Sequence, residues 1–133
     1  MPETILPRKK SLILTEAELR LMNIVWDNGT ATVGEVAAGL TGKPVLAYNT
    51  VLTTLRILEQ KGYVRHTTSR EGRAFVYRAV VDRDQASRNA LRRLVRGFFA
   101  NSPELLVLHL LDDGELSQQE IRTIRNLLAE GEK

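Results

Sequence analysis

The sequence predicts a mainly helical protein with one small β-hairpin, and three observations lead to this fold class. Helix-start signals recur along the 133 residues, apolar residues repeat with helical spacing, and only residues 63–80 have the composition of strands. The chain has no cysteine, only two histidines and no run of 18 apolar residues. We therefore expect one small domain with a helical extension, without disulfides, thiolate metal sites, a membrane span or a secretory signal.

Capping signals mark the predicted helix starts. In a capping box, a short polar side chain and a Glu or Gln three residues later each bond the other's backbone N–H. Four pairs have this spacing, and one start has serine before proline: Thr15–Glu18, Thr32–Glu35, Asp82–Gln85, Ser117–Glu120 and Ser102–Pro103. These signals predict at least five helices in a short chain.

The first three predicted helices span about 16–27, 33–40 and 48–61. Asn28-Gly29 ends the first, and Gly62 ends the third, because glycine accepts the left-handed backbone of a helix C-cap. After Gly62, residues 63–69 and 74–80 are rich in β-branched and aromatic residues, with a turn between them. They predict a two-stranded hairpin that must pack on the helices, because an isolated hairpin is marginally stable.

From Asp82 the helical period returns. Residues 104–111 are apolar nearly all round, and Ile121, Ile124 and Leu128 form one stripe of a last helix at about 118–129. Three helices followed by a hairpin are typical of a winged helix-turn-helix, here residues 1–81. Residues 82–133 are a helical segment, reached through a short linker at Val81-Asp82, and its apolar character predicts a dimerisation domain.

The third predicted helix has a face suited to DNA bases. Its apolar side chains gather on one side, while Asn49, Thr53 and Arg56 project from the other. Asn can bond adenine with two hydrogen bonds, Arg can do so with guanine, and Thr offers a hydroxyl and a methyl group. The alternative is that this polar side is only an ordinary solvent-exposed helix face. Its one acidic residue, Glu59, lies toward the flank.

Positive charge gathers in the same region. Residues 43–78 contain seven Lys or Arg and two Asp or Glu, although the net charge of the chain is only +3. Arg70 and Arg73 flank the hairpin turn, where they can reach phosphates or the minor groove. The alternative is that they only keep an exposed hairpin soluble. Phosphate contacts would make binding strongly salt dependent.

Three segments resemble the penicillinase-repressor (BlaI/MecI/CopY) family of bacterial winged-helix regulators. They read LTEAELRLMNIVWDNGTATVGEVA (14–37), AYNTVLTTLRILEQKGYV (47–64) and FVYRAVVDRD (75–84), and the similarity covers about residues 14–128. The resemblance implies a cytoplasmic homodimer that represses transcription by binding a palindromic operator on double-stranded DNA through the third helix and the hairpin wing.

The resemblance and the residue chemistry together name the candidate sites. The candidate DNA-binding residues are Thr32, Tyr48, Asn49, Thr50, Leu52, Thr53, Arg56, Arg70 and Arg73. Some relatives carry a basic residue where Leu52 stands, so the base read there is open. The candidate dimerisation residues are Leu105, Leu106, Leu108, Leu110, Leu111, Ile121, Ile124 and Leu128. This segment is too apolar to stay exposed on a monomer, and packing on its own N-terminal domain is the alternative.

The resemblance does not identify the signal that would release the protein from DNA. One branch of the family is cleaved at an Asn-Phe bond, but the matching position reads His109-Leu110; another branch binds metal through a cysteine-rich tail that has no counterpart here. A membrane sensor protease stays a possible partner. We expect no cofactor, no metal and no catalytic residue, because no nucleophile or phosphate-loop pattern is present. A winged-helix module that binds only protein is the alternative function.

Overall fold

The computed structural model describes residues 13–43 and 45–131. The chain divides into two compact units between Arg88 and Asn89. This division falls inside α4 (Arg83–Phe98), whereas the sequence prediction put the boundary before that helix. The first six residues of α4 (83–88) therefore belong to the N-terminal unit.

The three N-terminal helices begin where the sequence predicts. They are α1 (Glu16–Asn28), α2 (Val33–Gly39) and α3 (Tyr48–Gln60). Both predicted capping boxes are formed with both reciprocal bonds, in each case 2.8 Å to the glutamate and 3.1 Å to the threonine. Gly62 follows α3 with φ +88°, as expected of a residue that ends a helix in the left-handed region.

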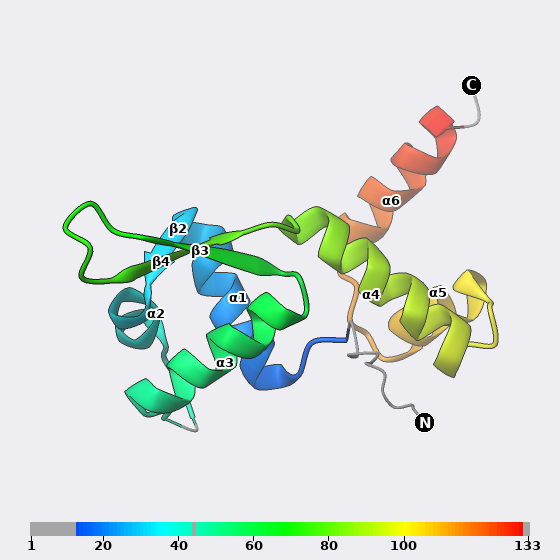
Figure 1. Ribbon diagram of the computed structural model, residues 1–133. Helices are drawn as coiled ribbons and strands as arrows, with labels where there is room; N and C mark the ends of the chain where they lie inside the picture. Colours follow the sequence, from blue (N-terminus) through cyan, green and yellow to red (C-terminus); the bar gives the residue numbers. More distant parts are fainter. Residues whose placement is uncertain (1–12, 44, 132–133) are drawn as a thin grey trace, which may run out of the picture. The chain divides into compact units, whose positions relative to one another are not determined.

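The predicted hairpin is confirmed as β3 (Val64–Thr68) and β4 (Phe75–Ala79), and the sheet has one further strand that the sequence did not predict. A third strand, β2 (Thr30–Thr32), pairs antiparallel with β4 and makes the sheet order β2-β4-β3 (Figure 1). Three residues are too short for an alternating pattern, and Thr32 also serves as the N-cap of α2. The sequence around Thr32 was therefore interpreted only as a helix start, and the strand before it was not predicted.

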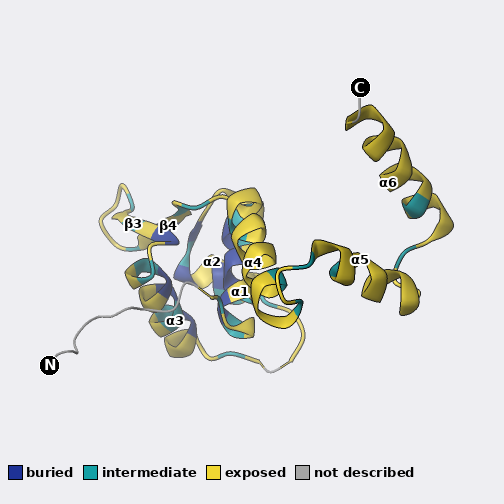
Figure 2. Cartoon of the chain, turned by 90° about the vertical axis from the view of Figure 1, so that its right-hand side faces the viewer, coloured by how far each residue is buried: buried dark blue, intermediate teal, exposed yellow. Residues whose placement is uncertain are grey.

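The hydrophobic core lies between the three helices and this sheet, and Figure 2 shows the buried residues gathered there. Each helix contributes one apolar stripe, and the sheet contributes Ala31, Val64 and Tyr77. The buried helical residues are Leu21, Met22, Val25, Val33, Val36, Val51, Leu55 and Leu58. Because Val51, Leu55 and Leu58 are fully buried, the opposite side of α3 must face outward.

One buried ion pair fixes the C-terminal end of α3 to α1. Lys61 Nζ lies 2.8 Å from Glu18 Oε1, and the two side chains are only 11% and 7% exposed. The same ammonium group donates to the carbonyl of Ile13 at 3.1 Å. Burial by itself raises the pKa of Glu18, but hydrogen bonds and charge attraction from Lys61 and Thr15 outweigh it, so the pKa lies below its ordinary value.

A second set of contacts fixes the start of α4 to α1. The Trp26 indole N–H donates to the Val81 carbonyl at 2.9 Å. The Arg83 guanidinium lies over the Trp26 ring at 5.3 Å and 2.8 Å from a carboxylate oxygen of Asp27. These contacts hold the first residues after β4 against α1.

The C-terminal unit holds the rest of α4, α5 (Pro103–Asp112) and α6 (Gln118–Gly131). Its predicted caps are formed: the Ser102 hydroxyl accepts from Leu105 N, and Ser117 and Glu120 bond each other's backbone. No described residue of this unit is buried (Figure 2). None of the described helices is both long and apolar enough to cross a membrane.

Candidate nucleic-acid interface

The outer face of α3 carries the side chains that the sequence predicted for it. Tyr48, Asn49, Thr50, Thr53 and Arg56 are all exposed. Their exposure follows from the burial of the opposite stripe, because side chains about half a turn apart on a helix point in opposite directions. The short polar side chains therefore stand clear of the core, which is the geometry that base recognition requires.

Leu52 is placed differently from its neighbours. It is partly buried and packs against the hydrophobic core, and it also lines a hollow on the surface. Its apolar side chain therefore helps to hold α3 in place and presents only part of its surface outward.

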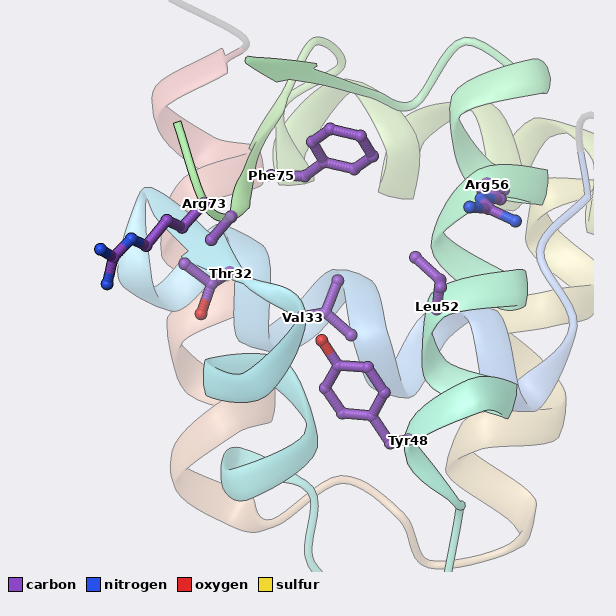
Figure 3. A pocket seen from close by; sticks show the side chains of 8 residues that line it. Thr32, Val33, Tyr48, Leu52, Arg56, Arg73 and Phe75 are labelled. Carbon is purple, nitrogen blue, oxygen red and sulfur yellow. The ribbon is translucent and has the colours of Figure 1, made fainter. Parts of the chain in front are cut away.

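The hollow lies between α3, the start of α2 and the wing, which we define as β3, β4 and the turn 69–74. Its volume is about 220 Å³, and Figure 3 shows the Tyr48 and Phe75 rings directed into the gap, whereas the Arg73 guanidinium points away from it. It is lined by Thr32, Val33, Tyr48, Leu52, Arg56, Arg73, Ala74 and Phe75. Five predicted DNA-binding residues are thus brought together at one place, although they come from three separate segments of the chain.

The other predicted DNA-binding residues do not line the hollow. Asn49, Thr50 and Thr53 lie on the exposed side of α3, and Arg70 lies in the wing turn. Thr32 lies at the edge of the hollow, where its hydroxyl already accepts a hydrogen bond from Glu35 N as the cap of α2. That hydroxyl keeps its own hydrogen for a further acceptor.

The turn of the wing is held by Ser69, a residue that the sequence reasoning missed. The Ser69 hydroxyl accepts from the backbone N–H groups of Arg73 and Ala74 at 3.3 and 3.2 Å. Gly72 sits in the turn with φ +72°, a conformation that other residues rarely adopt. A serine next to a glycine-containing turn was the available signal, since Ser side chains often bond nearby backbone groups.

The basic side chains of this surface are not neutralised by carboxylates. In the described part of the chain, Arg56, Arg70 and Arg73 form no ion pair, and all three are exposed. Glu59 does have a partner: its carboxylate bonds His66 Nδ1 at 2.7 Å, toward β3. A polyanion approaching this surface therefore meets available guanidinium groups.

The buried Tyr77 lies beneath this surface. Burial raises the pKa of its hydroxyl, the negative charge of Glu59 raises it further, and the positive charge of Arg56 opposes both. Both charged residues of α3 thus contribute to the electrostatic environment of this hydroxyl.

The start of α3 has no side chain to satisfy its backbone N–H groups. Ala47 occupies the N-cap and makes no side-chain hydrogen bond, since its side chain has no polar atom. Free N–H groups at a helix start favour an anion, because they donate hydrogen bonds at the positive end of the helix dipole. This end of α3 adjoins the exposed Tyr48 and Asn49.

The predicted dimerisation residues are found on α5 and α6. Leu106 and Ile121 are partly buried, and the remaining ones are exposed: Leu105, Leu108, Leu110, Leu111, Ile124 and Leu128. Phe98 is 85% exposed and Leu128 65% exposed in the single chain. His109 packs edge-on against Phe99, with ring centroids 5.3 Å apart. The described residues contain no group of three metal-ligating side chains.

Comparison with known proteins agrees with this geometry. The penicillinase repressor of Bacillus licheniformis is 28% identical over 122 residues, which cover 92% of this chain and 94% of the relative. The methicillin resistance regulatory protein MecI of Staphylococcus aureus is 27% identical over 123 residues, covering 90% and 95%. A mutant MarR of E. coli, solved in complex with operator DNA, shares the fold, with a TM-score of 0.51, 19% identity and coverage of 90% and 76%. The model of the family described as "Penicillinase repressor" matches residues 14–130, and this chain belongs to that family.

Proposed function

We propose that this protein is a sequence-specific DNA-binding transcriptional repressor. The observation that carries the proposal is the outer face of α3, where Asn49, Thr53 and Arg56 are exposed together beside a wing with available arginines. Membership of the penicillinase repressor family supports it. The protein is not an enzyme, because its family is one of repressors.

In this proposal α3 enters the major groove and the wing contacts the backbone beside it. Asn49 bonds the edge of an adenine, Arg56 bonds a guanine, and Thr53 contacts a thymine methyl or a polar base edge. Tyr48, Thr50 and the start of α3 contact phosphates, which fix the register of the helix. Arg70 and Arg73 contact the backbone or minor groove and add affinity for any sequence.

We also propose that the active form is a homodimer on a palindromic operator. A unit whose described leucines and phenylalanines are this exposed gains little stability as a lone chain, whereas a second copy covers the same apolar surface. The two α3 helices of such a dimer face the same side of the duplex, with half-sites about one or two turns apart.

The cellular setting follows from the proposed activity. A repressor must share a compartment with its DNA, so we place the protein in the cytoplasm. A membrane sensor protease is the proposed class of regulating partner, and His109-Leu110 is the bond to examine, because both residues are exposed on α5.

The test is to select genomic fragments with purified protein and to measure binding to the enriched site. We expect one motif with twofold symmetry. Asn49→Ala should reduce the preference for that motif over unrelated DNA by about 1–3 kcal/mol. The matched control is Asn126→Ala, which removes an exposed helical asparagine from α6. A folded, dimeric protein that enriches no motif would refute the proposal and favour the protein-interaction module.

A further inference from the structure

A compact set of contacts joins α3 to the wing. Glu59, in the last turn of α3, receives hydrogen bonds from both the ring and the backbone of His66 in β3. His66 Nδ1 lies 2.7 and 2.9 Å from the two carboxylate oxygens, and His66 N donates to Oε2 at 3.3 Å. A carboxylate only accepts, so Nδ1 must carry its hydrogen in this arrangement. Both parts of His66 are thereby tied to α3.

The same His66 ring packs against the other strand of the wing. Its centroid lies 4.4 Å from that of Phe75 and 5.6 Å from that of Tyr77. Phe75 lines the hollow together with Leu52 of α3, and Arg73 stands two residues before it (Figure 3). The contacts therefore run without a break from Glu59 through His66 to the base of the wing turn.

Because Glu59 is negatively charged, its electrostatic effect on DNA binding and its structural effect are expected to be opposite. Glu59 is one of two acidic residues between positions 43 and 78, on a segment whose seven basic residues would attract DNA. If Glu59 acted only through its charge, removing it would strengthen DNA binding, because a carboxylate repels phosphates. If Glu59 instead supports DNA binding through its structural contacts, removing it would weaken binding.

We propose that Glu59 is a positioning residue for DNA binding: through His66 and Phe75 it holds the wing at a set distance from α3. With the wing so held, Arg73 reaches the backbone while α3 occupies the major groove. The inference rests on the proposed DNA-binding function and adds to it the residue that couples its two contact elements. Glu59 touches neither base nor phosphate in this arrangement.

The experiment compares Glu59→Ala with Glu71→Ala on the selected duplex, by fluorescence anisotropy at several salt concentrations. Glu71 is an exposed acid of the wing turn, so its removal changes the charge equally but leaves His66 untouched. Glu71→Ala should bind DNA as tightly as the parent or slightly tighter. Glu59→Ala should bind about five- to tenfold more weakly, an effect in the range of typical coupling energies between two sites.

Two further variants separate positioning from a loss of fold. Glu59→Gln keeps an acceptor for the His66 ring and should recover part of the affinity that Glu59→Ala loses. In a protein that already carries Arg73→Ala, the effect of Glu59→Ala should shrink, because the wing contact that it positions is gone. Thermal unfolding of each variant reports whether the domain stays folded.

The outcomes are distinct. Glu59→Ala that binds as tightly as Glu71→Ala, while the parent binds its motif, overturns the positioning role and leaves the repressor proposal intact. An equal loss with and without Arg73 also overturns it, because Glu59 would then not act through the wing. A parent protein that binds no selected duplex overturns the proposed function itself.

Discussion

The two capping boxes of α1 and α2 offer a measurement of what the buried ion pair contributes to stability. Glu18 and Glu35 occupy the same position in their boxes, with matching hydrogen-bond distances of 2.8 and 3.1 Å. They differ in surroundings: Glu35 is exposed, whereas Glu18 is buried and bonds Lys61 at 2.8 Å. Replacing each glutamate by alanine removes the same hydrogen bond, from the threonine backbone N–H to the glutamate, but only one replacement leaves a buried ammonium group without its counter-ion.

The expected magnitudes follow from these surroundings. Glu35→Ala should lower the free energy of unfolding by about 1 kcal/mol, the typical net value of one hydrogen bond. Glu18→Ala should lower it by about 3–5 kcal/mol, because breaking a buried pair on one side strands the other charge. Such a loss is a large part of the stability of a small domain. Urea unfolding followed by circular dichroism measures both values.

The pH dependence gives an independent check of the same reasoning. Because the folded-state pKa of Glu18 lies below its ordinary value of 4.5, its contribution is present above that value. It is lost as the pH falls through the lower folded-state pKa, where the carboxylate becomes protonated. Glu18→Gln should remove this acid-sensitive part. If Glu18→Ala and Glu35→Ala unfold at the same urea concentration, the ion pair contributes nothing and the reasoning fails.

Three further predictions concern DNA binding and assembly. Thr53→Ala should cost about 1–3 kcal/mol of preference for the selected motif, whereas Thr123→Ala on α6 should leave binding curves unchanged. Arg73→Ala should weaken binding to all duplexes alike and reduce the slope of log affinity against log salt by about one; a loss confined to one sequence would contradict a phosphate contact. Leu128→Asp should shift the protein toward monomer in sedimentation velocity, while Leu19→Asp, on the exposed side of α1, should not. Unchanged dimers of Leu128→Asp would exclude this part of α6 from the interface.

The helix starts could be predicted from the sequence because they depend on neighbours in the chain. Thr15 with Glu18 and Thr32 with Glu35 form their boxes over three residues, so the spacing alone identifies them. The outer face of α3 was predictable for a similar reason. A helical repeat with one apolar stripe assigns every other side chain a direction, and the full burial of that stripe confirms it.

Contacts between distant segments could not be predicted in this way. β2 has three residues and pairs with β4 more than forty positions later, and no local pattern marks such a partner. Glu59 was noted only as an acid at the flank of α3, and its bond to His66 appears once β3 folds back on that helix. Lys61 gains its partner Glu18 in the same way.

Residue spacing alone was enough to locate the helix starts and to assign the polar side of α3. It also showed that the C-terminal segment carries apolar residues, mostly leucine, with helical spacing. Folding in three dimensions was needed to establish which side chains meet, such as the His66 ring against Phe75, and Lys61 against Glu18. The difference lies in the range of the interactions. Caps and helix faces are set by residues three or four positions apart, whereas a hollow or a buried ion pair exists only after the chain has closed around it.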